Sequence, residues 1–186
     1  MTARIAPASP PYPEKVQQWL QRVMPPGRDP LVLFTTLARD ERLADRFFSG
    51  GLLDRGNLSL RQREIVIART TALCRSEYEW GVHIAFFAER VGLTEEQRRS
   101  LVTGSADDPC WSPGEALLVR LCDELHATST LSDGLWDALR KEHSEAALLE
   151  LLMLAGQYHM VSYLTNALRL PLEGFAARFP QDAPGR

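Results

Sequence analysis

The feature that most constrains the fold of this chain is a helix-start signal that recurs along it. A serine or threonine is followed three residues later by glutamate or glutamine at Ser59/Gln62, Ser76/Glu79, Thr94/Gln97 and Ser112/Glu115. This spacing is typical of a capping box, in which two side chains satisfy backbone N–H groups that the first helical turn leaves free. We find no segment in which apolar and polar residues alternate with a period of two. The sequence therefore predicts an all-α fold with no sheet.

Helical periodicity also predicts elements outside these signals. We expect a peripheral helix over 13–23, a helical stretch from Leu31 to Phe48, a shorter helix over 133–141 and a long final helix over 145–170. The chain then divides into an N-terminal extension with one helix (1–29), a helical domain (30–171) and a loosely docked C-terminal tail (172–186). A chain of 186 residues is long enough to bury one substantial core.

Charge and cysteine content limit the classes of partner. The net charge of −3 gives no basis for a nucleic-acid groove or an anionic membrane surface. The three cysteines, Cys74, Cys110 and Cys122, form no Cys-x-x-Cys pair, which favours a reducing compartment over a disulfide framework. The most apolar stretch, 146–155, is too short to span a bilayer. We expect a cytoplasmic protein with a small-molecule substrate, and no nucleic-acid or membrane partner.

The final helix bears on assembly. Between Ala146 and Ala155 almost every residue is apolar, so the helix has nearly no polar face there. Such a helix is either central to its own fold or shared with another subunit. In a chain this short, we expect part of the helix to be buried in its own subunit and part to contact a second subunit, and we therefore expect a homo-oligomer.

Four residues form the candidate site for chemistry. Ser76, Glu79 and His83 are three and four residues apart, so they share one face of a helix, and Glu64 lies on the preceding helix. If the two helices form an antiparallel hairpin, Glu64 can lie opposite Glu79 and His83. A histidine between carboxylates, screened from water by Trp80, is suited to general acid–base chemistry.

A purely structural interpretation explains part of this pattern. Ser76 with Glu79 is also an ordinary capping box, and Glu79 with His83 is a helical pair that is worth only about 0.2–0.5 kcal/mol in isolation. His83 could equally be a core histidine with satisfied hydrogen bonds. On spacing alone, this interpretation has the advantage.

Longer motifs add a resemblance to a known family. The runs 60–67 and 76–83, followed by Gly92-Leu93-Thr94, by 156–161 and by Asn166, resemble the carboxymuconolactone decarboxylase family, which includes the alkylhydroperoxidase D-like proteins. The resemblance covers about residues 31–171. It implies an alkylhydroperoxidase D-like helical bundle that forms oligomers.

The peroxidase branch of that family carries a glutamate followed by Cys-x-x-Cys-x-x-x-His. Anchored on His83, the motif places Ser76 and Glu79 where the cysteines would be and Glu64 where the relay glutamate would be. Neither Ser76 nor Glu79 can form a disulfide, so this resemblance implies a proton relay without the family's peroxidase mechanism. Cys74 has no partner at redox spacing.

The resemblance therefore implies a lyase or isomerase that transfers protons beside a carbonyl or lactone, with decarboxylation as one possibility. His83 is the expected general acid/base, Glu79 and Glu64 orient it, and no cofactor or metal is expected. The expected substrate-binding residues are Ser76, Trp80, Tyr158 and Asn166.

Other interpretations remain open at this point. The chain could be a non-catalytic ligand-binding or assembly module, or a weak peroxidase that uses Cys74. Glu64, Glu79 and His83 could also hold a metal. Arginines on the helix of Glu64 are expected to be mostly solvated, although one could hold a substrate carboxylate, and His126 is expected to have no chemical role.

Overall fold

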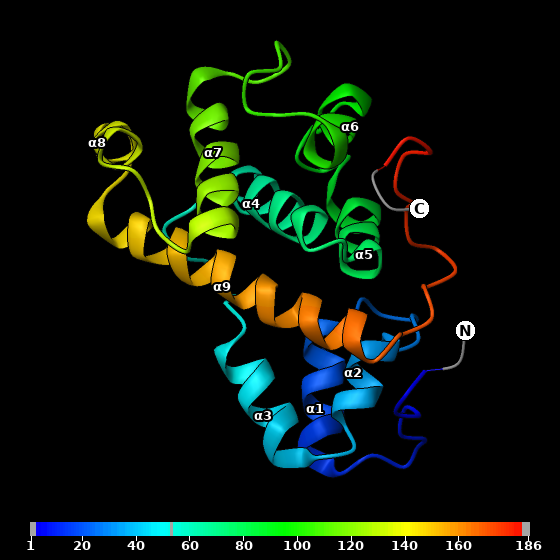
Figure 1. Ribbon diagram of the computed structural model, residues 1–186. Helices are drawn as coiled ribbons and strands as arrows, with labels where there is room; N and C mark the ends of the chain where they lie inside the picture. The colour runs from blue at the N-terminus through cyan, green and yellow to red at the C-terminus, as the bar shows by residue number, and fades with distance from the viewer. Residues whose placement is uncertain (1–2, 53, 184–186) are drawn as a thin grey trace.

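The computed structural model describes residues 3–52 and 54–183, and this part of the chain is helical, with no strand. Figure 1 shows the arrangement of its helices. They are α1 (Glu14–Val23), α2 (Val32–Leu37), α3 (Glu41–Gly50), α4 (Leu60–Leu73), α5 (Glu77–Phe87), α6 (Glu95–Thr103), α7 (Pro113–Thr128), α8 (Asp133–Glu142) and α9 (Glu145–Ala167). The prediction of an all-α fold is confirmed. Among the described helices, none combines the length and apolarity that a membrane crossing requires.

Helix α4 is the centre of the main core. Every residue from Arg63 to Ala72 is buried, and α5, α6, α7 and α9 all pack against the helix. Ile65, Val66 and Ile67 are fully buried, and the buried residues of α4 also include the charged Arg63, Glu64 and Arg69. Because α4 and α5 are consecutive and joined by a tight turn at Cys74–Ser76, polar residues on their facing sides are brought together. This turn positions the candidate site.

The predicted helix starts account for much of the local structure. The pairs Ser59/Gln62, Thr94/Gln97 and Ser112/Glu115 all form complete capping boxes. Pro113 occupies the first turn of α7, where its missing N–H costs nothing. Helix α9 ends at Ala167, before the predicted end at Leu170, because Arg169 takes up a left-handed backbone conformation with φ of 52°.

The first three helices form a smaller cluster of their own. Val16 and Leu20 of α1 are buried against Ala44 and Phe48 of α3, and the ring of Trp19 stacks on Phe48 at 5.8 Å. In Figure 1 this cluster lies across α9 from the helices of the main core. The helix predicted at 13–23 is therefore packed on α2 and α3 through a hydrophobic core.

The C-terminal tail, which the structure describes as far as residue 183, is docked more closely than the sequence indicated. It runs beside α5 (Figure 1), and the N–H of Ala177 donates to the carbonyl of Gly81 at 3.0 Å. A Cβ at Gly81 would lie 2.2 Å from the carbonyl oxygen of Ala177, so only glycine permits this approach. Phe179 then packs its ring edge-on against Trp80, with 5.1 Å between the centroids. The expectation of a loosely docked tail missed these contacts because backbone docking leaves little trace in sequence.

Candidate active site

A histidine lies between two carboxylates at the contact of α4 and α5. His83 Nδ1 is 2.8 Å from Glu64 Oε2, and His83 Nε2 is 3.4 Å from Glu79 Oε1. Glu64 comes from α4, while Glu79 and His83 stand one turn apart on α5. The structure thus brings together the three residues that the sequence singled out for catalysis.

The three side chains are almost buried, with exposed fractions of 11% for His83, 5% for Glu64 and 9% for Glu79. Burial by itself disfavours a charged imidazole and lowers its pKa. The charges of Glu64 and Glu79, and their contacts with the ring, outweigh burial and raise the pKa of His83 to about 10. At neutral pH the ring is therefore an imidazolium with a carboxylate on each side.

Glu79 does not complete the capping box that its spacing predicts. Ser76 Oγ accepts from the N–H of Glu79 at 3.4 Å, but the N–H of Ser76 donates to the carbonyl of Thr71 at 2.8 Å. The Glu79 carboxylate turns instead to His83 through Oε1, and its buried Oε2 has no hydrogen-bond partner. A buried carboxylate oxygen without a partner is costly, which makes it a candidate acceptor for a proton or a ligand.

Aromatic rings enclose the histidine. Tyr158 of α9 meets the His83 ring edge-on, with 5.1 Å between centroids, and Phe87 of α5 lies at 5.5 Å. Burial, followed by the negative charges of Glu79 and Glu64, raises the pKa of Tyr158 well above its usual value. The hydroxyl of Tyr158 therefore keeps its proton beside the cluster, at a place where α4, α5 and α9 converge.

The donor atoms of this cluster do not converge on one point. Glu64 contacts one nitrogen of the His83 ring and Glu79 contacts the other, so the imidazole separates the two carboxylates. A metal ion would need all three donors around a common centre. The geometry thus disfavours the metal site considered from the sequence at these residues.

Three of the expected substrate-binding residues make contacts within the chain, and two of them, Trp80 and Asn166, also line cavities beside α5. Ser76 is completely buried and its hydroxyl is 2.8 Å from that of Thr165, so it caps α5 and packs against α9. Trp80 faces Phe179 of the tail. Asn166 donates its side-chain amide to the carbonyl of Cys74 at 2.8 Å. The sequence pattern could not separate these contacts within the chain from contacts to a substrate.

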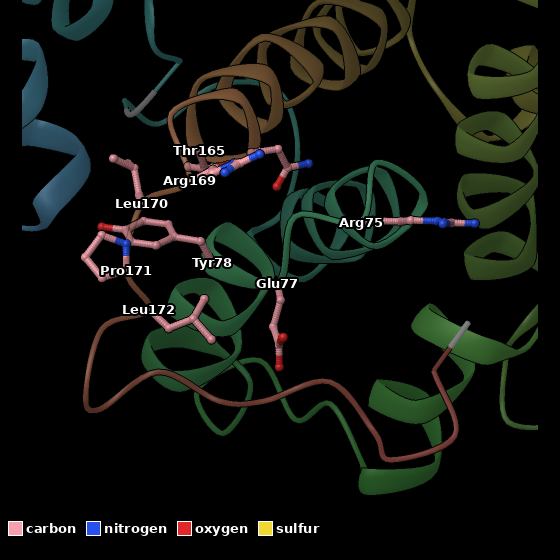
Figure 2. Close-up of a pocket in the computed structure, with 9 residues that line it drawn as sticks. Arg75, Glu77, Tyr78, Thr165, Arg169, Leu170, Pro171 and Leu172 are labelled. Atoms are coloured by element: carbon pink, nitrogen blue, oxygen red, sulfur yellow. The ribbon is translucent and has the colours of Figure 1, made fainter. Parts of the chain in front are cut away.

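Two cavities flank α5. One of about 440 Å³ lies between α5 and the end of α9, and Figure 2 shows the ring of Tyr78 directed toward Leu170 and Pro171 at its wall, with Arg75 pointing away. The other, of about 750 Å³, is lined by Trp80, by arginines of α6 and by the tail. His83 lines neither cavity. In the isolated chain it reaches solvent only through its 11% exposed side chain.

A buried ion pair next to the site was not predicted from the sequence. The arginines on the helix of Glu64 are expected from the sequence to be mostly solvated, but Arg63 is 8% exposed and its Nη1 lies 3.5 Å from Oε1 of Glu150 on α9. The second oxygen of Glu150 accepts from the backbone and the side chain of Asn57 at 2.5 and 3.0 Å. Glu150, which interrupts the most apolar stretch of the chain, was the available signal for a buried charged partner.

The chain resembles known proteins in part of its sequence and in its fold. The sequence profile of the carboxymuconolactone decarboxylase family matches residues 42–120, which include Glu64, Glu79 and His83. Among curated protein sequences, none matches the chain.

Solved structures share the fold at low sequence identity. An uncharacterized peroxidase-related protein from Silicibacter sp. TM1040 superimposes with a TM-score of 0.78 and 16% identity, over 93% of this chain and 92% of that one. A second such protein, from Ralstonia eutropha JMP134 and described as an alkylhydroperoxidase AhpD core, gives 0.73 and 14%, over 93% and 95%. The debrominase Bmp8, in complex with 2,3,4-tribromopyrrole, gives 0.72 and 13%, over 94% of each chain. The chain thus resembles the carboxymuconolactone decarboxylase family over residues 42–120 and has the same fold as these peroxidase-related structures.

Proposed function

We propose that this protein is a small-molecule lyase or isomerase that moves a proton at a carbon beside a carbonyl or lactone group. One observation carries the proposal: Oε2 of Glu79 is buried without a hydrogen-bond partner, one turn from an imidazolium. A base and an acid held this close can remove a proton from carbon while the developing negative charge on oxygen is stabilised. Isomerisation and elimination begin with such a step, whereas loss of carbon dioxide leaves an enolate that ends with the reverse step, delivery of a proton to carbon.

The protonation state of His83 indicates which residue acts as the acid and which as the base. With a pKa raised to about 10, the ring is charged at neutral pH and acts as the acid, so that it donates to the substrate oxygen. Glu79 takes the proton from carbon through Oε2. Glu64 holds the Nδ1–H of His83 and keeps the ring oriented. The sequence suggested His83 as both acid and base, whereas the raised pKa favours Glu79 as the base.

Peroxidase chemistry has less support. Serine and glutamate stand at the two cysteine positions of the family's peroxidase motif, and neither is a redox group. Burial raises the pKa of the Cys74 thiol, which reduces the thiolate fraction that a peroxidase needs. We expect no hydroperoxide reduction that depends on Cys74.

The test is hydrogen exchange at carbon. Carboxymuconolactone and simple keto lactones would be incubated with the protein in D₂O, and both deuterium uptake and decarboxylation followed by NMR. We expect exchange with the wild type, and loss of it in Glu79→Gln with the fold retained. Glu115→Gln, which changes the cap of α7, is the matched control. Exchange at the same rate in Glu79→Gln and in the wild type would overturn the proposal.

A ligand-binding module of the same fold is the second candidate. It is favoured by the position of His83, which lines neither of the two cavities beside α5. In that case a lactone would bind without turnover, and Glu79→Gln would alter affinity alone. Binding measured by calorimetry beside the exchange assay separates the two candidates.

We also propose that a second copy of the chain covers the outer face of α9. The exposed residues Leu149, Met153, Gly156, Met160 and Tyr163 follow one another at intervals of four, three, four and three. This 3.5-residue repeat is the pattern of a helix that pairs with another helix, and a self-complementary face gives a two-fold dimer. Light scattering should find an assembly in the wild type and a smaller species in Met153→Glu. A monomeric wild type would contradict the proposal.

A further inference from the structure

Three side chains of types that can bind metals lie close together near the C-terminal end of α4. Cys74 follows α4 directly, His126 lies in the last turn of α7 and His159 lies in α9. His126 Nδ1 and His159 Nε2 are 3.4 Å apart, and Cys74 Sγ lies within 4.8 Å of one ring nitrogen of each histidine. In Figure 1 the C-terminal end of α7 reaches α9 near its middle. The cluster uses no residue of the candidate active site.

The spacing of the donor atoms fits one tetrahedral ion. A Zn²⁺ ion binds imidazole nitrogen at about 2.0–2.1 Å and thiolate sulfur at about 2.3 Å, which puts two nitrogens about 3.4 Å apart and a nitrogen and a sulfur about 3.6 Å apart. The nitrogens of His126 and His159 already stand at this separation. The sulfur would move at most about 1.2 Å closer, which a change in the Cys74 side-chain torsion supplies.

The surrounding structure holds the ligands in place. The N–H of Cys74 donates to the carbonyl of Thr70 at 3.0 Å, and its own carbonyl accepts from Asn166 of α9 at 2.8 Å. An imidazole binds a metal in its neutral form, through the lone pair of one ring nitrogen.

We propose that Cys74, His126 and His159 bind a zinc-class transition-metal ion, with water at the fourth position. One sulfur and two imidazole nitrogens favour Zn²⁺ and its neighbours over Mg²⁺ and Ca²⁺, which prefer oxygen. Binding releases the thiol proton of Cys74 to solvent, so affinity increases with pH. The ion links the end of α4 to α7 and α9. This site is independent of the proposed proton-transfer function.

The first experiment titrates Zn²⁺ into the chelator-treated full-length protein by calorimetry, and repeats the titration with Co²⁺ while the absorption spectrum is recorded. We expect one ion per chain, a thiolate-to-cobalt charge-transfer band, and the intense visible bands of tetrahedral Co²⁺. Absence of Zn²⁺ binding, or a Co²⁺ spectrum without the thiolate band, would overturn the proposal.

Variants then locate the ion. Cys74→Ser, His126→Asn and His159→Asn should each weaken Zn²⁺ binding by more than about tenfold. Loss of a residue that only supports a ligand already lowers metal affinity by at least about tenfold, and loss of a ligand should cost more. Cys110→Ser and His143→Asn remove the same donor types elsewhere and should leave affinity unchanged. His126 is exposed, so His126→Asn is expected to fold even if Cys74→Ser does not. An unchanged affinity in His126→Asn alone rules the site out.

Discussion

Helices α5 and α7 begin with the same pattern, a serine followed three residues later by glutamate, and both pack against α4. At α7 the pattern does what its spacing predicts. The N–H of Ser112 donates to Glu115 at 3.1 Å, and the N–H of Glu115 donates to Ser112 at 3.4 Å. At α5 only the second of these contacts forms, because Glu79 contacts His83.

The difference comes from the backbone before each helix. At α5 the tight turn after α4 gives the N–H of Ser76 another acceptor, the carbonyl of Thr71, so the cap does not need the glutamate. At α7 the preceding loop offers no such carbonyl within the described residues, and Glu115 serves both the cap and Arg61, at 2.5 Å. A local pattern therefore becomes available for chemistry when the fold satisfies its structural role by other means.

The largest expected effect is on activity. Glu79→Gln should lower the rate of the proposed proton transfer about 10²–10⁴-fold, since it removes the base while keeping the shape of the side chain. Glu115→Gln should leave that rate unchanged. Single-turnover rates at equal fold content, checked by circular dichroism, measure both. Equal rates in the two variants would erase the distinction between α5 and α7.

The second effect is on the pH dependence of stability, which should have opposite signs at the two helices. The folded pKa of His83 is raised from 6.5 to about 10, so its stabilisation is complete below pH 6.5 and is lost as the pH rises toward 10. Burial alone would raise the pKa of Glu115, but the contact with Arg61 outweighs burial and lowers this pKa below 4.5. The stabilisation that Glu115 gives to the fold is therefore complete at neutral pH and is lost in acid.

Denaturant unfolding from pH 2 to pH 10 tests these signs. In His83→Asn the alkaline decline should flatten, and in Glu64→Gln the NMR midpoint of the His83 ring should move down because the largest favourable charge is gone. A ring midpoint that is the same in Glu64→Gln and the wild type would mean that the two groups are not coupled.

The third effect concerns a glycine in each helix. Gly81→Ala places a methyl group 2.2 Å from the carbonyl oxygen of Ala177, so the tail must move away from α5, at a cost of about 1–3 kcal/mol. Gly114 in α7 has open space where a methyl group would stand, and Gly114→Ala should be neutral or stabilising by less than about 1 kcal/mol. Unfolding free energies give both values, and hydrogen exchange in residues 173–183 reports displacement of the tail.

Whether the sequence could predict a feature depends on how far apart along the chain the interacting residues lie. Helix starts depend on residues three apart, so the caps at Ser59, Thr94 and Ser112 could be predicted. The approach of Glu64 to His83 could also be predicted, because a short turn joins consecutive helices. The docking of Ala177 on Gly81 could not, since it joins segments far apart in the chain through backbone atoms.

The features that the sequence did not predict all join residues that lie far apart along the chain. Arg63 and Glu150 form a buried pair between α4 and α9, and each looks like an ordinary surface charge in its own segment. Cys74, His126 and His159 come from three helical segments and show no metal-binding spacing along the chain. Packing angles between helices decide both arrangements, and one sequence carries little record of those angles.

The smallest effect is on the two capping serines, and it tests whether Ser76 has any role beyond its cap. Ser112→Ala should cost about 1 kcal/mol, the usual loss for a serine cap, while Arg61 still holds Glu115. Ser76→Ala should cost about the same or slightly more, because its hydroxyl also pairs with Thr165 at 2.8 Å. Thr165 keeps its hydrogen bond to the carbonyl of Ser162, so no hydroxyl is left without a partner. Unfolding free energies and the rates of deuterium exchange at the substrate carbon should be measured together. If Ser76→Ala abolished exchange while losing no more stability than Ser112→Ala, Ser76 would act on the substrate as the sequence first suggested.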